Sequence, residues 1–593
     1  MKNSKAKTFD KYHIVRSEQE AINKMASYGK INEHEQAKLE ARRRTRKRIA
    51  IIAISSIVLV CIVVGAVVGT AANSNGKKPS STEGNGNGDS ISVSVKAVCD
   101  VTLHKDKCLE TVGSAPNAST LNPEELFNYA VQITLTELTK VLNGFSDNKH
   151  TDNATSAAMG ACVELIELAV DQLNETMTSL KDHTASSSKS VADLRTWLSS
   201  VETYQETCME ALVEANNPNT TTFGETHLKN STEMTSNALA IITWLGKIAD
   251  SIKLNHRRLL ATAEADLPMM SARGLLESSD LRKIANIVVA QDGSGKYRTI
   301  SEALVEVEEK NEKRTIIYVK KGVYVENVRV EKKKWNVVMV GDGQSKTIVS
   351  GGLNFIDGTP TFQTATFAVF GKGFMARDMG FRNTAGPAKH QAVALMVSAD
   401  LSVFYRCTMD AFQDTMYAHA QRQFYRECDI FGTVDFIFGN AAVVFQNCNI
   451  LPRRPMKGQQ NTITAQGKKD PNQNTGISIH NCTILPLDDL TDVQTFLGRP
   501  WKDFSTTVIM KSFMDGFINP KGWLPWVGDN APDTIFYAEH LNFGPGASTK
   551  NRVKWRGLRT FLTKKEANRF TVKPFIDGKK WLPSTKVPFK SDF

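Results

Sequence analysis

The feature that most constrains the fold is an aromatic-led string that recurs at intervals of 20 and 21 residues in the C-terminal half. It reads FYRCTMD from residue 404, FYRECDI from 424 and FQNCNI from 445, and IHNCTI resumes it at 479. An interval of this length is one coil of a parallel β-helix, in which each coil stacks on the last around an inward apolar ladder. A β-sandwich also has many short strands, but it does not need a fixed period. The spacing predicts a right-handed parallel β-helix over residues 283–593.

Two carboxylic acids in this region are separated by the length of one coil. Asp414 and Asp435 are 21 residues apart, and Gln391 precedes Gln413 by 22. Neighbouring strands lie about 4.8 Å apart, so we expect these side chains to converge on one face. Adjacent carboxylates do not both ionise easily, so one can act as an acid while the other stays ionised, and amides can bind a developing oxyanion. Stacked acidic ladders also occur as structural features, and spacing alone leaves that alternative open.

The preceding block, residues 95–255, has helical periodicity instead. Apolar residues recur at helical spacing in four segments of bundle length, which predicts an all-α four-helix bundle. The segments are 126–142, 161–177, 191–212 and 237–252.

Nine cysteines in 593 residues are too few for a disulfide-stapled miniprotein, so any bridges supplement a larger core. Four of them lie in the helical block. Their spacing favours a local Cys99–Cys108 bridge and an inter-helix Cys162–Cys208 bridge.

The N-terminal segments predict a membrane-anchored precursor. Residues 49–72 contain no charged side chain and are long enough to cross a bilayer. The basic tail, residues 1–48, ends in ARRRTRKR, so we expect it to stay cytosolic while the rest crosses. A cleaved signal peptide would have a shorter apolar run nearer the N-terminus, whereas later proteolytic release stays open. Residues 73–94 are rich in Gly, Ser and Asn and predict a flexible linker.

The net charge of +11 is unevenly distributed and does not indicate a nucleic-acid partner. Residues 91–255 carry a net charge of −10, and residues 256–593 carry +13. A lumenal or extracellular location is supported by six N-x-S/T sequons, five of them in the acidic block. Their asparagines are Asn117, Asn153, Asn174, Asn219, Asn230 and Asn481.

Five co-linear motifs resemble the signature set of plant-type pectin methylesterases, and residues 95–255 resemble the plant invertase and pectin methylesterase inhibitor family. The resemblance implies a carboxylic ester hydrolase that removes methyl groups from homogalacturonan during cell wall modification, with no cofactor and no metal. The motifs are GVYVENV (322–328), HQAVAL (390–395), QDTMY (413–417), GTVDFIFGNA (432–441) and LGRPW (497–501).

The resemblance also implies a role for each residue of the site. Asp435 is the nucleophile, and Asp414 protonates the departing methanol and then activates water. Gln391 and Gln413 form the oxyanion hole, and Arg499 holds the Asp435 carboxylate.

Further positions match family features. Cys428 and Cys448 match the family's disulfide, whereas Cys407 and Cys482 have no clear role and are expected as buried thiols. Tyr417 and Phe438 are expected as aromatic residues of the cleft, although each could simply be packing. The residues expected to contact substrate are Thr361, Gln391, Tyr417, Phe438, Arg499 and Trp501.

The segment between the two folds, residues 256–282, contains the dibasic pair Arg257–Arg258, which matches the family's processing site. The bundle is then either a restraint on the catalytic domain or a folding aid. The expected partners are pectin, a processing protease, separate inhibitor proteins and, through the anchor, the membrane. The expected destination, through the secretory pathway, is the cell wall.

Two alternatives belong to other classes. A polygalacturonase or pectate lyase shares the β-helix but needs carboxylates around a glycosidic bond or a calcium site. The other alternative is a catalytically silent wall-binding or inhibitor protein, and the presence of Asp414, Asp435 and Arg499 counts against it.

Overall fold

The computed structural model describes residues 92–146, 152–182, 188–259 and 280–593. The predicted basic tail and membrane anchor lie outside the described residues. Within the described part of the chain, no helix is both long and apolar enough to cross a membrane. The segment from Ile91 to Phe593 forms one compact unit.

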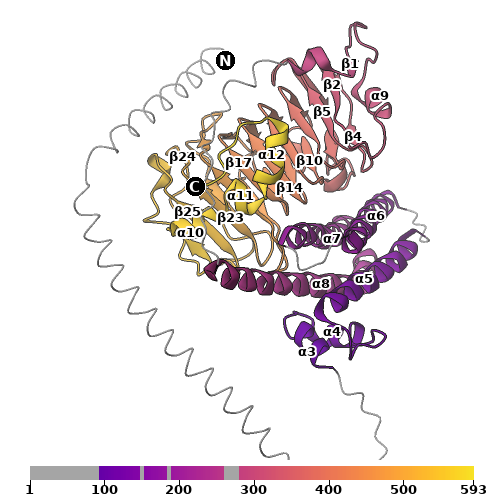
Figure 1. Cartoon of the computed structure of the whole chain (residues 1–593). Helices are drawn as coiled ribbons and strands as arrows, with labels where there is room; N and C mark the ends of the chain where they lie inside the picture. Colours follow the sequence, from indigo (N-terminus) through magenta and orange to yellow (C-terminus); the bar gives the residue numbers. More distant parts are fainter. Residues whose placement is uncertain (1–91, 147–151, 183–187, 260–279) are drawn as a thin grey trace, which may run out of the picture. The chain divides into compact units, whose positions relative to one another are not determined.

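The C-terminal half is built from three sheets whose strands are all parallel, as predicted for a β-helix (Figure 1). The first sheet contains β1 (Ile287–Val289), β2 (Thr315–Val319), β5 (Val337–Val340), β8 (Met375–Arg377), β11 (Ser402–Tyr405), β14 (Arg422–Arg426), β17 (Ala442–Gln446), β20 (Gly476–His480), β23 (Thr506–Met510), β25 (Phe536–His540) and β26 (Leu558–Arg559). The second contains β4 (Val328–Val330), β7 (Phe367–Val369), β10 (Leu395–Val397), β13 (Met416–Ala418), β16 (Ile437–Gly439), β19 (Asn461–Gln466) and β22 (Thr495–Gly498). The third contains β3 (Gly322–Val325), β6 (Thr347–Gly351), β9 (Gly380–Asn383), β12 (Thr408–Asp410), β15 (Asp429–Gly432), β18 (Asn449–Pro452), β21 (Thr483–Ile484) and β24 (Phe513–Met514).

The recurring aromatic strings stack inside these coils, but one of them is shifted by a residue. Phe404 pairs with Tyr425, and Tyr425 pairs with Phe445; each pair of ring centroids is 4.9 Å apart. Successive strand residues point to opposite faces, so Phe424 lies on the outer face of the first sheet, in the same buried apolar cluster as Val572. The aromatic residue that continues the ladder is therefore Tyr425, the second residue of its string.

Short helices complete the β-helix. The C-terminal ones pack on the outer face of the first sheet beside Phe424. The full set of short helices in this half is η2 (Leu281–Ile284), α9 (Ile300–Val305), η3 (Thr361–Gln363), η4 (Pro387–Lys389), η5 (Pro545–Ala547), α10 (Lys564–Asn568), α11 (Val572–Phe575) and α12 (Gly578–Thr585).

The N-terminal block is helical, and its four long helices confirm the predicted bundle. The helices are α3 (Val93–Cys99), α4 (Lys105–Thr111), α5 (Pro123–Ser146), α6 (Asn153–Asp182), α7 (Ser188–Glu214) and α8 (Pro218–Leu259). Disulfides join Cys99 to Cys108 and Cys162 to Cys208, as their spacing predicts. The last helix is longer at both ends than the predicted segment 237–252, because α8 begins at Pro218 and continues through Arg257 and Arg258.

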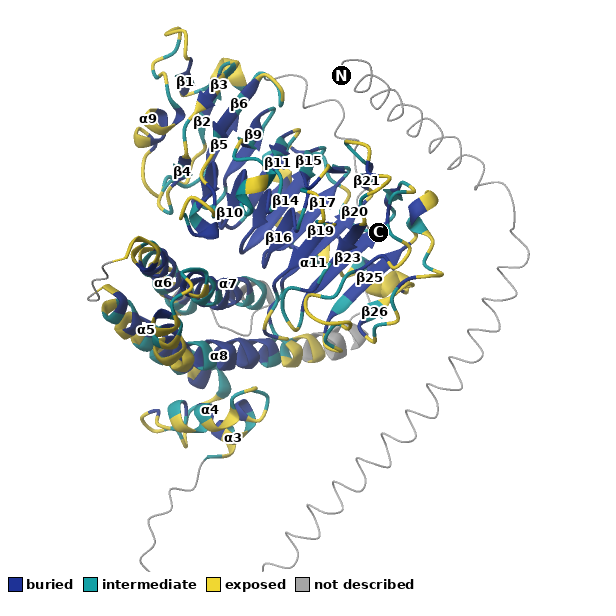
Figure 2. Ribbon diagram, turned by 180° about the vertical axis from the view of Figure 1, so that it is seen from behind, coloured by how far each residue is buried: buried dark blue, intermediate teal, exposed yellow. Residues whose placement is uncertain are grey.

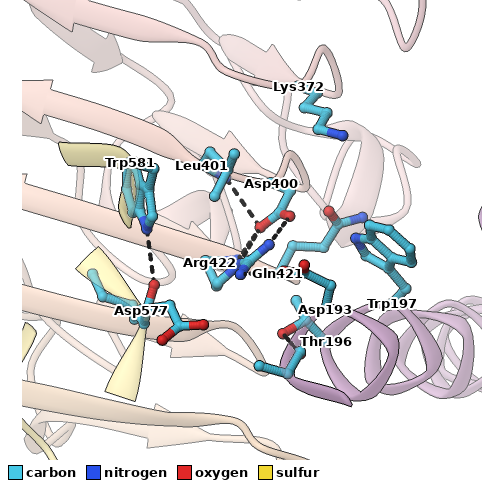
Figure 3. Close-up of polar contacts among 12 residues, drawn as sticks. Asp193, Thr196, Trp197, Lys372, Asp400, Leu401, Gln421, Arg422, Asp577 and Trp581 are labelled. Atoms are coloured by element: carbon cyan, nitrogen blue, oxygen red, sulfur yellow. Dashed lines mark hydrogen bonds and ion pairs between the residues drawn. The ribbon is translucent and has the colours of Figure 1, made fainter. Parts of the chain in front are cut away.

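The bundle packs on the outer face of the second sheet. Its apolar core continues onto Met396, Tyr417 and Phe438 of that sheet, which are buried. Figure 2 shows the labelled strands β10, β16 and β19 of this sheet in the dark blue of buried residues. Arg422 joins the β-helix to the bundle. Its guanidinium donates to Asp400 of the β-helix at 2.6 Å and to Asp193 of α7 at 2.7 Å (Figure 3).

The core inside the coils is independent of the bundle. Its buried residues extend from Ile287 to Tyr537, and none of them belongs to the helical block. The β-helix therefore carries a complete hydrophobic core of its own, which is the property expected of a domain that folds alone.

The predicted Cys428–Cys448 disulfide is wrong for this structure. Cys407, Cys428, Cys448 and Cys482 are all free and buried. They occupy one ladder position on four successive coils, next to the pairs Thr408–Asp429, Asp429–Asn449 and Asn449–Thr483. Their thiols lie close to main-chain carbonyls, as at Cys428 Sγ and Phe404 O, 3.4 Å apart. Every neighbour in the ladder is an equivalent partner, so coil spacing alone does not select one pair.

This arrangement predicts which cysteines react with an alkylating reagent after unfolding without reduction. Peptides that contain the four ladder cysteines should be alkylated, and those that contain Cys99, Cys108, Cys162 and Cys208 should not. Peptide mapping by mass spectrometry measures both sets in one sample. Protection of Cys428 and Cys448 together would restore the disulfide that the resemblance implied.

Candidate active site

Asp414 and Asp435 occupy equivalent positions on neighbouring coils. Each lies two residues before a strand of the second sheet, and Met416 of β13 pairs with Ile437 of β16. Both aspartates have left-handed backbones, with φ of 60° and 50°. Non-glycine residues adopt this conformation rarely, and it persists where the surrounding structure fixes it. Both side chains line one cavity of about 890 Å³.

The Asp435 carboxylate is held by cationic and hydroxyl donors. Arg499 donates from Nε to Oδ1 at 2.9 Å and from Nη2 to Oδ2 at 2.6 Å. Thr462 Oγ1 donates to Oδ1 at 2.6 Å and accepts the Asp435 backbone N–H at 2.8 Å. A bidentate guanidinium adds geometric specificity, and with the hydroxyl donor it fixes the position of both carboxylate oxygens. Asp435 is therefore the member of the pair whose carboxylate is held in one orientation beside a cation.

Asp414 is in the opposite electrostatic situation. Burial raises its pKa well above the ordinary value, and the negative charges of Asp435 and of Glu214 in α7 raise it further. The positive charge of Arg499 acts in the other direction but is a smaller effect. Asp414 therefore retains a proton at pH values at which an ordinary aspartate has lost it. The two acids can serve as donor and nucleophile at the same pH.

Two glutamines lie beside the acids. The backbone N–H of Ala392 donates to the carbonyl of Gln413 at 3.3 Å, which places Gln391 and Gln413 on adjacent coils. Both line the same cavity as Asp414 and Asp435. The predicted set of two acids, two amides and one arginine is therefore brought together.

The predicted aromatic residues form one wall of the cavity. The rings of Tyr417 and Phe438 are stacked with centroids 4.1 Å apart, and Trp501 lies 6.0 Å from Phe438. Trp526 also lines the cavity and was not predicted; the Arg499 guanidinium lies 4.2 Å from its ring centroid. The coil period does not predict Trp526, because this residue lies outside the strands.

Thr462 is a second contact that was not predicted, and the reason is the length of one coil. It lies 27 residues after Asp435, not 20 or 21, although β19 pairs directly with β16. The loop at residues 453–460 adds length without changing the register. A search at one fixed interval therefore passes over this residue.

Helix α7 of the bundle reaches into the same cavity. Glu214 accepts hydrogen bonds from the backbone N–H of Thr361 at 3.0 Å and from its hydroxyl at 2.6 Å. Lys502 Nζ donates to Glu206 at 2.7 Å and forms an ion pair with Glu210 at 2.8 Å. Thr361, which the resemblance implies as a substrate contact, is therefore occupied by a carboxylate of the bundle.

This site on a parallel β-helix is that of a carboxylic ester hydrolase, and the chain belongs to the pectinesterase family. The family model described as Pectinesterase matches residues 286–579. The model described as Plant invertase/pectin methylesterase inhibitor matches residues 93–241, so the bundle is an inhibitor-like domain.

Known proteins of the same family resemble the chain over nearly its whole length. It is 81% identical to "Probable pectinesterase/pectinesterase inhibitor 46" of Arabidopsis thaliana, over 96% of this chain and 100% of that protein. It is 47% identical to "Pectinesterase 3" of Phaseolus vulgaris, over 96% of this chain and 100% of that one. Among solved structures, pectin methylesterase from carrot is 52% identical, with a TM-score of 0.52, over 52% of this chain and 98% of that one.

The raised pKa of Asp414 predicts that this acid costs stability at neutral pH. A carboxyl group whose pKa is higher in the folded state destabilises the fold once the pH exceeds its unfolded value of about 4. Asp414→Asn should therefore raise the melting temperature at pH 7 by roughly 1–2 °C, the shift expected for about 1 kcal/mol in a domain of about 300 residues. The gain should disappear below pH 4. Calorimetry across this range measures it.

Asp435→Asn is the matched control, because the amide loses the charge that binds Arg499 and Thr462. This variant should melt below the wild type at pH 7. A lower melting temperature for Asp414→Asn at pH 7 would contradict the assignment of a retained proton.

Proposed function

We propose that the β-helix hydrolyses the methyl esters of homogalacturonan and releases methanol and de-esterified pectin. The observation that carries the proposal is the asymmetry of the acid pair. Asp435 is held by Arg499 and Thr462 through both of its carboxylate oxygens, whereas burial raises the pKa of Asp414 and favours its protonated form. The names of the related pectinesterases support the substrate class.

The first half of the reaction forms an acyl-enzyme. An oxygen of Asp435 attacks the ester carbonyl carbon, and the electron pair moves onto the carbonyl oxygen. The side-chain amides of Gln391 and Gln413 donate to that oxyanion. When the intermediate collapses, the bond to the methoxy group breaks and the leaving oxygen takes the proton of Asp414, so that methanol departs. The galacturonyl group is then joined to Asp435 as an anhydride.

The second half returns both acids to their starting states. Asp414, now ionised, takes a proton from a water molecule, and the oxygen of that water attacks the galacturonyl carbonyl carbon of the anhydride. The bond to Asp435 breaks, and the Asp435 carboxylate recovers its bonds to Arg499 and Thr462. The product is the free acid of galacturonate.

This mechanism predicts unequal effects for the two acids. Asp435→Asn should lower turnover by at least ~10³-fold, because an amide does not form the acyl intermediate. Asp414→Asn removes acid–base assistance and should cost about 10²–10⁴-fold. Methanol release from esterified pectin measures both, with circular dichroism to show that the fold is kept. Near wild-type release by Asp435→Asn would remove its role as nucleophile. Loss of polymer length without methanol would favour a lyase or glycosidase.

We also propose that the inhibitor-like bundle restrains this activity in the uncut chain. Its support is that α7 carboxylates bind Thr361 and Lys502 inside the cavity, and that the bundle buries Tyr417 and Phe438. The opposite net charges of the two blocks add attraction, and the covalent link raises the effective concentration of the bundle to roughly millimolar.

Cleavage after Arg258 is then expected to raise activity. The uncut chain and the cut chain should be assayed for methanol release at equal dilution, at low and high salt. A charge-assisted restraint gives low activity that increases on cleavage and, in part, with salt, because salt screens exposed ion pairs. Equal activity before and after cleavage would exclude the restraint and leave the bundle as a folding aid.

The proposed route is through the secretory pathway to the cell wall, with the membrane anchor at residues 49–72 as part of the precursor. The asparagines of all six sequons are exposed, and two disulfides are present in the bundle. Exposed sequons are accessible to glycosylation in the lumen. Mass loss after endoglycosidase treatment tests this route, and a cytosolic chain would show none.

A further inference from the structure

Four acidic residues form a stripe along α7. Glu202, Glu206, Glu210 and Glu214 recur at intervals of four residues, so they lie on one face of the helix. All four line the cavity that contains Asp414 and Asp435. The inner face of the bundle therefore presents a row of carboxylates to the active site.

Two lysines of the β-helix bind the middle of this row. Lys502 Nζ lies 2.7 Å from Glu206 and 2.8 Å from Glu210. Lys469 Nζ donates to the second oxygen of Glu206 at 2.5 Å. Neither lysine forms an ion pair with an acid of the β-helix among the described residues.

The two lysines lie in the same cavity as the reacting acids. Lys502 directly follows Trp501, and its ammonium lies 5.1 Å from the Trp501 ring centroid. Both lysines line the cavity together with Asp414 and Asp435. When the bundle leaves, two cations remain on the cavity wall without their carboxylate partners.

Other lysines at the interface bind the bundle without lining the cavity. Lys372 forms an ion pair with Glu175 of α6 at 3.1 Å, and Lys332 forms one with Asp171. Contact with the bundle therefore does not require a lysine inside the active-site cavity. The location of Lys502 and Lys469 needs a further reason.

We infer that Lys502 and Lys469 form a receptor for the free carboxylate of a galacturonate residue next to the ester under attack, and that the α7 acids occupy this receptor in the uncut chain. The inference deepens the proposed function and rests on it. Each residue of the polymer carries a carboxyl group that is either a neutral methyl ester or an anion. An ammonium group forms a stronger, charge-assisted hydrogen bond with the anion. The receptor selects chains in which an ester has a de-esterified neighbour.

The test uses the β-helix that is separated after cleavage behind Arg258, since this part contains its own core. Methanol release is measured on two oligogalacturonate pools of equal length, one fully methyl-esterified and one partly de-esterified. The readout is the ratio of kcat/KM for the second pool to that for the first. The wild type should favour the partly de-esterified pool.

Lys502→Gln should reduce this ratio by roughly tenfold, the loss expected for one charge-assisted hydrogen bond, mainly through KM. Lys469→Gln should reduce it less, because Lys469 binds one α7 carboxylate in the uncut chain, whereas Lys502 binds two. Lys372→Gln is the matched control: Lys372 is also paired with the bundle in the uncut chain, but it lies outside the cavity, so the ratio should not change.

Each outcome has a separate meaning. A ratio that is the same in Lys502→Gln and the wild type overturns the receptor while methanol release still supports the proposed function. An equal fall in Lys372→Gln also overturns it, because a general loss of positive charge then explains the effect. The absence of methanol from both pools in the wild type would count against the proposed function itself.

Discussion

The structure depends on the stacking of parallel coils in register. Each strand of the second sheet pairs with the strand one coil away, so a residue that precedes one strand meets the residue that precedes the next. This single constraint brings Asp414 beside Asp435 and Gln391 beside Gln413, although neither pair is close in sequence. The loops between strands vary in length without changing the pairing. The β-helix can therefore alter the rim of its cavity while the acids stay in register.

The same constraint explains which parts of the fold could be predicted from the sequence. The coil period indicated the architecture and the acid pair, and helical periodicity indicated the bundle. The spacing of the four cysteines in the bundle indicated both of its disulfides. The period did not indicate which of two adjacent aromatic residues in a coil faces inward. Matching strings by their first aromatic residue aligned Phe424 with Phe404, whereas the ladder continues through Tyr425.

Three site features were beyond sequence reasoning for physical reasons. Thr462 follows a lengthened loop, and Trp526 lies in a loop, where no period applies. The contacts of α7 with Thr361 and Lys502 join segments that are about 150 and 300 residues apart, and no local pattern relates them. The catalytic roles of Asp414 and Asp435 were implied by the resemblance. The structure shows how their surroundings differ: Asp435 is bound by Arg499 and Thr462, whereas burial raises the pKa of Asp414.

The length of α8 has a consequence for maturation. A protease binds its substrate with an extended backbone, but Arg257 and Arg258 lie in the last turn of a helix that ends at Leu259. Helix ends open locally at low free-energy cost, whereas the interior does not. The rate of cutting then depends on how often this final turn unwinds. The sequence of the last helical turn, and not only the two arginines, would set the timing with which the enzyme is released.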